Sequence, residues 1–111
     1  MDIINGHNDY GVVLVTTDSE EEAENIAAAV VELKLAACVN ILPIHCSVYI
    51  WEGKVNKDKE WQLIIKTKLS KFSALKAKIC ELHSYDVPEI IALPIVDGSQ
   101  TYLQWISEQV T

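Results

Sequence analysis

Short apolar runs alternate along the chain with stretches in which apolar residues recur every three or four positions. Tyr10–Thr17 is a short run rich in β-branched residues, and it predicts a buried strand. Residues 18–22 then open a helix, where we expect Ser19 to cap the first turn and Glu22 to complete a capping box. The buried face of this helix follows at helical spacing: Ala23, Ile26, Ala27, Val30 and Leu33.

The middle of the chain has the pattern of a hairpin. Residues 37–51 predict a long strand, in which Pro43 marks an edge, a bulge or a bend because proline cannot donate to a sheet ladder. Residues 52–58 are polar and contain a glycine, as a connection would, and residues 59–68 predict the returning strand. Its residues alternate between two faces, with Trp61, Leu63 and Ile65 on one and Gln62, Ile64 and Lys66 on the other.

A second helix and a fourth strand follow. We expect Ser70 to cap the helix, and residues 83–89 to end it in a polar corner. Residues 90–96 predict a strand in which Pro94 indicates an edge or a late position, and residues 97–99 turn into a short last helix. The apolar stripe of the second helix consists of Phe72, Leu75, Ile79 and Leu82.

The resulting order, β-α-β-β-α-β with a C-terminal helix, predicts an α+β fold of the split βαβ, or ferredoxin-like, kind. We expect one domain over residues 10–111 and a flexible segment over residues 1–9. Two helices cover only one face of such a sheet. Tyr49, Trp51 and Trp61 add apolar area to the hairpin, so we expect the uncovered face to meet another subunit.

Charge and composition narrow the choice of partners. The net charge is −7, and all nine basic residues are lysines, so the chain lacks the arginine preferred for phosphate and guanine recognition. We therefore expect no nucleic-acid partner. No apolar run reaches the roughly 18 residues of a membrane span, and the first ten residues lack a secretion signal, so we expect no membrane partner and a cytoplasmic location. The three cysteines form no C-x-x-C pair, which fits a reducing compartment.

Several short motifs occur together in one order. They are residues 34–40 with Pro43, residues 49–54, residues 60–67, His83 with Tyr85 and residues 87–89, and Tyr102-Leu103 with Trp105. Together they resemble the CutA family of divalent-cation tolerance proteins over residues 12–110. The resemblance implies a ferredoxin-like subunit, related in architecture to the PII signalling proteins and assembled as a homotrimer. It also implies tolerance of copper(II) or another divalent cation, no organic cofactor and no catalytic reaction.

The resemblance also implies a site at the boundaries between subunits. His83, Cys38 and Glu89 are its candidate metal ligands, and Lys66, Glu60 and Tyr85 its candidate cleft residues. Family members associated with copper carry further donors in positions held here by Thr16 and Leu82, and a single imidazole is a weak copper site.

Other interpretations of these residues stay open. His83 can simply close a helix end, and Cys38 can pack as a small apolar residue. At the level of function, the alternative is a PII-like signalling or scaffold trimer that binds a small metabolite or a partner protein. A third interpretation is a trimer whose role is assembly alone.

Overall fold

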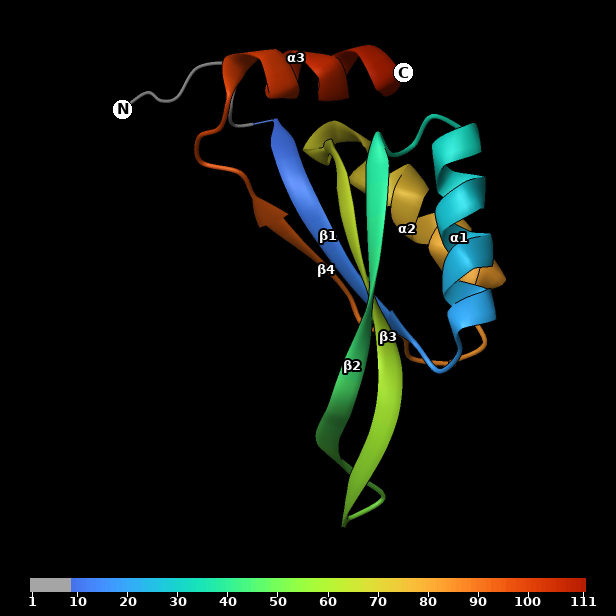
Figure 1. Cartoon of the computed structure of the whole chain (residues 1–111). Helices are drawn as coiled ribbons and strands as arrows, with labels where there is room; N and C mark the ends of the chain where they lie inside the picture. Colours follow the sequence, from blue (N-terminus) through green and yellow to red (C-terminus); the bar gives the residue numbers. More distant parts are fainter. Residues whose placement is uncertain (1–8) are drawn as a thin grey trace.

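The computed structural model describes residues 9–111 and contains one four-stranded antiparallel sheet in the order β2-β3-β1-β4 (Figure 1). This confirms the predicted α+β, ferredoxin-like class. The division into residues 1–9 and a domain over 10–111 stays a prediction, because residues 1–8 lie outside the described part. The elements are β1 Tyr10–Thr17, α1 Glu20–Glu32, β2 Cys38–Trp51, β3 Lys54–Lys68, the 3₁₀ turn η1 Leu69–Lys71, α2 Phe72–Leu82, β4 Ile90–Pro94 and α3 Gln100–Gln109.

The main core lies between the sheet and the helices α1 and α2. Odd-numbered residues of β1 and β3 point toward the helices, because side chains alternate along a strand. Each fully buried aliphatic side chain here stabilises the fold by roughly 1.5–3 kcal/mol. The core consists of Val13, Val15, Ala23, Ile26, Val30, Ala36, Leu63, Ile65, Leu75 and Ile79. Trp61 packs against this core, so our assignment of its ring to the uncovered apolar area was wrong.

Helix α3 lies across one end of the sheet (Figure 1). Leu103, Ile106 and Val110 form a second apolar cluster there with Tyr10 and Ala37. The C-terminal helix therefore closes the end of the sheet at which β1 begins.

The face of the sheet turned away from α1 and α2, which we call the open face, has no helix over its middle. Leu42 of β2 and Ile91 and Leu93 of β4 lie on it and are 43%, 48% and 46% exposed. The strands β2 and β4 are the two edges of the sheet. An edge strand tolerates proline, which cannot donate to a sheet ladder, and this explains how Pro94 fits within β4.

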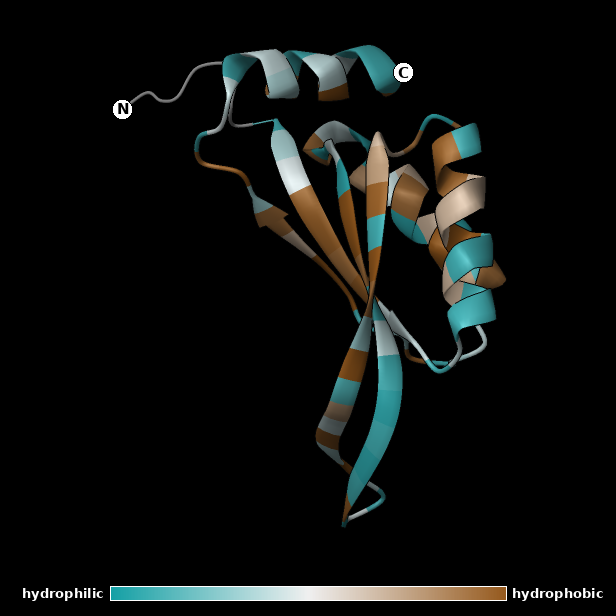
Figure 2. Cartoon of the chain, viewed as in Figure 1, coloured by the Kyte–Doolittle hydropathy of each residue, from teal (hydrophilic) through white to brown (hydrophobic). Residues whose placement is uncertain are grey.

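The β2–β3 hairpin extends beyond the rest of the sheet (Figure 1). Its turn is only Glu52 and Gly53, with φ of 52° and 79°, as a two-residue hairpin turn of left-handed backbone requires. The predicted connection over residues 52–58 was therefore too long, since β3 already begins at Lys54. Residues 54–58 are hydrophilic except for Val55, while the outer part of β2 contains several apolar residues, as Figure 2 shows.

Two helix starts differ from the predictions in an informative way. Ser19 caps α1 as expected, its Oγ accepting from the Glu22 backbone N–H at 3.1 Å. The Glu22 carboxylate does not complete the capping box and instead accepts from the Ser84 N–H at 3.1 Å. Ser70 does not cap α2; it lies in η1, and its N–H donates to Asp9.

Candidate functional site

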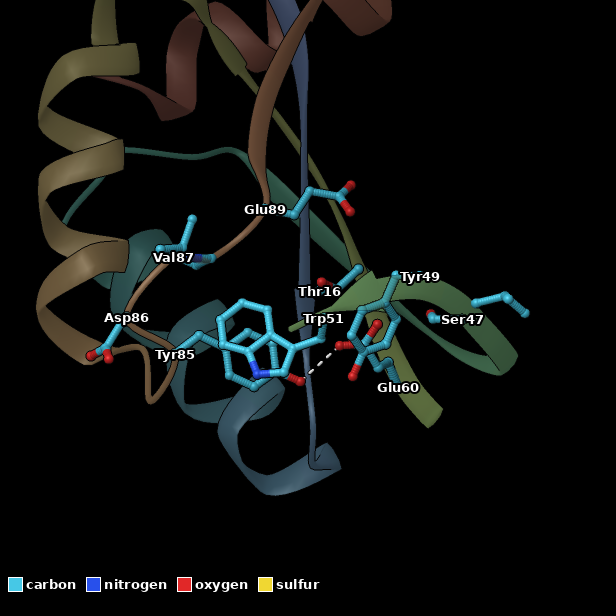
Figure 3. A pocket seen from close by; sticks show the side chains of 11 residues that line it. Thr16, Ser47, Tyr49, Trp51, Glu60, Tyr85, Asp86, Val87 and Glu89 are labelled. Carbon is cyan, nitrogen blue, oxygen red and sulfur yellow. Dashed lines mark hydrogen bonds between the residues drawn. The ribbon is translucent and has the colours of Figure 1, made fainter. Parts of the chain in front are cut away.

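A hollow of about 670 Å³ lies where the hairpin leaves the sheet (Figure 3). It is bounded by the end of β1, by the outer hairpin, and by the segment between α2 and β4. We call it the hairpin hollow. Its lining residues are Thr16, Ser47, Val48, Tyr49, Trp51, Glu60, Tyr85, Asp86, Val87, Pro88 and Glu89.

A tyrosine and a carboxylate join two walls of the hairpin hollow. The Tyr85 hydroxyl donates to Glu60 Oε2 at 2.7 Å, and Figure 3 shows this bond between the loop and β3. Burial and then this hydrogen bond raise the pKa of Tyr85, so the phenol keeps its proton at neutral pH. Tyr49 makes a similar hydrogen bond to Asp58 within the hairpin, which raises the pKa of Tyr49. Two of the hollow's aromatic side chains are thus oriented by carboxylates.

Glu89 is a second carboxylate on the hairpin hollow. Burial raises its pKa first, and the negative charge of Glu60 raises it further. A cation near these two groups would relieve that cost. Among residues 9–111, however, no three or more His, Cys, Asp or Glu side chains are gathered closely enough to hold a metal ion. The acidic hollow therefore suits weak electrostatic attraction of a hydrated cation, not a preformed metal cage.

His83, the first candidate metal ligand, is buried behind this wall, and its side chain has no exposed surface. Its Nε2–H donates to the Thr16 carbonyl at 2.7 Å, and its Nδ1 accepts from the Tyr85 N–H at 3.0 Å. A carbonyl oxygen can only accept, so the Thr16 carbonyl requires a hydrogen on Nε2. Both ring nitrogens are occupied by protein groups.

The surroundings of His83 tie α1 to the loop after α2. Glu22 Oε2 lies 3.2 Å from His83 Nδ1 while also accepting from Ser84, and the Tyr85 ring lies 4.8 Å from the imidazole, centroid to centroid. His83 therefore positions Tyr85, which in turn holds Glu60. Sequence reasoning missed the part played by Glu22, because its partner lies 62 residues away and the capping pattern explained the residue locally.

The remaining candidates lie elsewhere on the sheet. Cys38 and Lys66 are direct partners in the β2–β3 register, at the end near α3. Burial and then the Cys38 thiol raise the pKa of Tyr102, which places this cysteine beside α3. Neither residue lines the hairpin hollow.

The structure does not bring the three candidate metal ligands together. Cys38 begins β2 at one edge of the sheet and near α3, whereas Glu89 precedes β4 at the other edge and toward the opposite end. The three strand spacings between them alone separate the two residues by about 14 Å. His83 lies behind the hollow, and only Glu89 of the three lines it. Of the candidate cleft residues, Glu60 and Tyr85 meet there and Lys66 does not.

The fold and the hollow define a small ferredoxin-like protein with an uncovered sheet face and an acidic, aromatic hollow beside a projecting hairpin. The family model "CutA1 divalent ion tolerance protein" matches residues 11–109. The chain belongs to this family of divalent-cation tolerance proteins.

Individual relatives agree in sequence and in fold. The chain is 52% identical over 97 residues to the divalent-cation tolerance protein CutA of Thermus thermophilus, covering 87% of this chain and 94% of that protein. It is 52% identical over 95 residues to the chloroplastic CutA of Arabidopsis thaliana, covering 86% of this chain but only 52% of that protein. The solved structure of the periplasmic divalent cation tolerance protein CutA from Archaeoglobus fulgidus matches with a TM-score of 0.90 at 43% identity, covering 92% of this chain and 99% of that one.

The location of the protein stays a prediction. Two of these relatives are described as chloroplastic and periplasmic, so the family is not confined to one compartment. Within residues 9–111, no helix is long and apolar enough to cross a membrane.

Proposed function

We propose that this protein contributes to divalent-cation tolerance as a cytoplasmic homotrimer that binds divalent cations, copper(II) included, weakly at clefts between its subunits. Family membership supports the role in tolerance. The observation that supports the site is the pair Glu60 and Glu89 on one hollow, where burial and then the negative charge of Glu60 raise the pKa of Glu89. The role is one of binding and not of catalysis.

Glu89 and Glu60 supply the protein's oxygen ligands in this proposal, and water completes the coordination of the cation. Carboxylate and water oxygens suit hard and borderline divalent cations, which exchange readily when only one or two protein ligands hold them. Tyr85 keeps Glu60 in place through its hydroxyl. His83 acts behind Tyr85, since direct ligation would require its ring to leave Thr16 or Tyr85.

Calorimetric titration of Cu²⁺ into the wild-type protein and into Glu89→Gln tests this site. We expect the variant to bind Cu²⁺ at least about tenfold more weakly, because the loss of a supporting group at a metal site commonly lowers metal affinity by that much. Glu24→Gln on the exposed side of α1 is the matched control and should bind as the wild type does. Equal affinity of the wild type and Glu89→Gln would remove the hairpin hollow from the proposal.

Assembly as a trimer is supported by the apolar side chains that one subunit leaves uncovered. They lie on the open face and along the outer hairpin, where Ile50 and Trp51 are 65% and 58% exposed. Contiguous apolar surface of this kind marks subunit contacts. Because the hairpin hollow lies beside this surface, a neighbouring subunit would border it.

Sedimentation velocity of the wild type and of Leu93→Glu tests the assembly. Leu93 lies on the open face, and a buried carboxylate there should split the trimer. Leu33→Glu is the control, because Leu33 is similarly exposed, at 52%, but lies at the end of α1. A folded wild-type monomer at micromolar concentration would contradict the proposed trimer.

A second candidate function is PII-like binding of a small metabolite. The size and lining of the hairpin hollow favour it: about 670 Å³ is typical of small-molecule sites, and Tyr49, Trp51 and Tyr85 offer aromatic contacts. A thermal-shift screen separates the two functions. Stabilisation by an organic molecule but not by any divalent cation would favour the metabolite.

A further inference from the structure

The β2–β3 hairpin contains one irregularity, a bulge in β2. Ile44 pairs with Glu60 and Ser47 pairs with Asp58, so two residues of β2, His45 and Cys46, stand opposite a single residue of β3. The bulge lies just outside the level of Trp61, the first residue of β3 that pairs with β1. An inserted residue of this kind bends a strand and re-aims its side chains.

The register fixes the side of the hairpin on which the two extra residues lie. Ile44 and Ser47 both pair with even-numbered residues of β3, so both point to the side of the open face. A regular strand would place positions three apart on opposite sides. Because positions 44 and 47 share a side, His45 and Cys46 both lie on the opposite side, with Lys59. The bulge thus places an imidazole and a thiol side by side.

Within one subunit, both side chains are accessible and lightly engaged. His45 and Cys46 are exposed, and the Cys46 thiol lies 4.0 Å from the Ser47 carbonyl as its one weak contact within residues 9–111. Over the same residues the His45 ring has no hydrogen bond or ion pair. Their Cα atoms are about 3.8 Å apart, as in any consecutive pair.

We propose that His45 and Cys46 form a copper(I) site. A thiolate is the soft ligand that copper(I) prefers, and imidazole also suits copper. Copper(I) is satisfied by two such donors, whereas zinc takes four ligands in a structural site. On binding, the Cys46 thiol releases its proton to water and forms a sulfur–copper bond, and the metal keeps its oxidation state. The bound unit carries no net charge, so the Lys59 ammonium on the same side does not oppose it.

This site is distinct from the hairpin hollow, because neither His45 nor Cys46 lines that hollow. It therefore does not depend on the function proposed above. The surroundings of Cys46 also differ from those of the other two cysteines. Cys38 lies beside α3. Cys80 is exposed on α2, and the imidazole of His83 at the end of that helix is buried and hydrogen-bonded. Only at the bulge does the described part of the chain offer a thiol with an accessible imidazole beside it.

Anaerobic titration of the full chain with copper(I), in competition with the chromophoric chelator bicinchoninate, tests the proposal. We expect one copper(I) per chain, and an affinity lower by about tenfold or more in both Cys46→Ser and His45→Ala. Cys80→Ser is the matched control, since it removes an exposed thiol without a free imidazole, and it should bind as the wild type does. The exchanged pair, His45→Cys with Cys46→His, keeps both donors on one side and should retain binding.

Wild-type affinity in His45→Ala would overturn the proposal, because the thiol alone would then account for binding. Wild-type affinity in Cys46→Ser, or loss of binding in Cys80→Ser, would overturn it as well. Copper(I) is diamagnetic, so NMR gives a second readout on the unmodified chain. We expect the ring resonances of His45 to shift and those of buried His83 to stay; the reverse pattern would assign the metal to His83.

Discussion

Replacing His83 by alanine is expected to destabilise the folded chain strongly, even without metal. The variant removes two hydrogen bonds, from Nε2 to the Thr16 carbonyl and from the Tyr85 N–H to Nδ1, worth about 1 kcal/mol each. It also empties a site whose side chain has no exposed surface, which adds about 1–2 kcal/mol for the cavity and the stranded polar groups. The expected loss is about 3–4 kcal/mol of unfolding free energy.

Urea denaturation followed by circular dichroism measures this loss, at one protein concentration because an oligomer's stability depends on it. His45→Ala is the control, since an exposed histidine should change stability by no more than about 0.5 kcal/mol. His83→Gln should recover part of the loss, because its amide N–H can replace the Nε2–H donor but not the Nδ1 acceptor. If His83→Ala unfolds at the same urea concentration as His45→Ala, His83 does not hold the loop in place.

Three further predictions concern the hairpin hollow and the hairpin turn. Glu89→Gln should raise the unfolding temperature at pH 7: the raised pKa means that the folded chain binds this proton more tightly than the unfolded chain, so the charged carboxylate costs stability above that pKa. The gain should disappear as the pH falls below about 4, where both states are protonated, and a gain that persists there would refute this cause. Tyr85→Phe should lower the unfolding free energy by about 1 kcal/mol through loss of the hydroxyl bond to Glu60, as urea denaturation can measure; no change would mean that water replaces the bond fully. Gly53→Ala should cost about 1 kcal/mol in the same assay because its φ is 79°, whereas Glu52→Asn should stabilise, since asparagine tolerates the left-handed backbone better; equal effects of the two variants would contradict the turn assignment.

The fold was predictable from the sequence where side chains meet the core. The alternation of Leu63 and Ile65, and the helical spacing of Ile26 and Val30, reflect burial against one continuous core, and burial imposes a readable period. The outer half of β3 was missed for the converse reason. Residues 54–58 pair with β2 but belong to neither apolar cluster of the subunit, so their composition is that of a loop although their backbone is extended.

The candidate site was predictable only in part. The resemblance singled out Tyr85, Glu60 and Glu89, which do share one hollow. It could not reveal that both nitrogens of His83 are used, because the partners are a backbone carbonyl and a backbone N–H, which leave no trace in residue identity. The predicted set of metal ligands also contained both Cys38 and Glu89. These residues lie at opposite edges of the sheet, which becomes clear only when the order of the strands is known.

The central place of β1 has a consequence for how the chain folds during synthesis. β1 is made before both of its partners, β3 and β4, whose paired residues end at Lys68 and Pro94. The β2–β3 hairpin can close first across its two-residue turn, whereas β1 must wait for distant partners. Until then an apolar, β-branched segment is exposed to other chains. Asp18 and the glutamates that open α1 follow it directly, so the charges at this helix start also protect the nascent chain from aggregation.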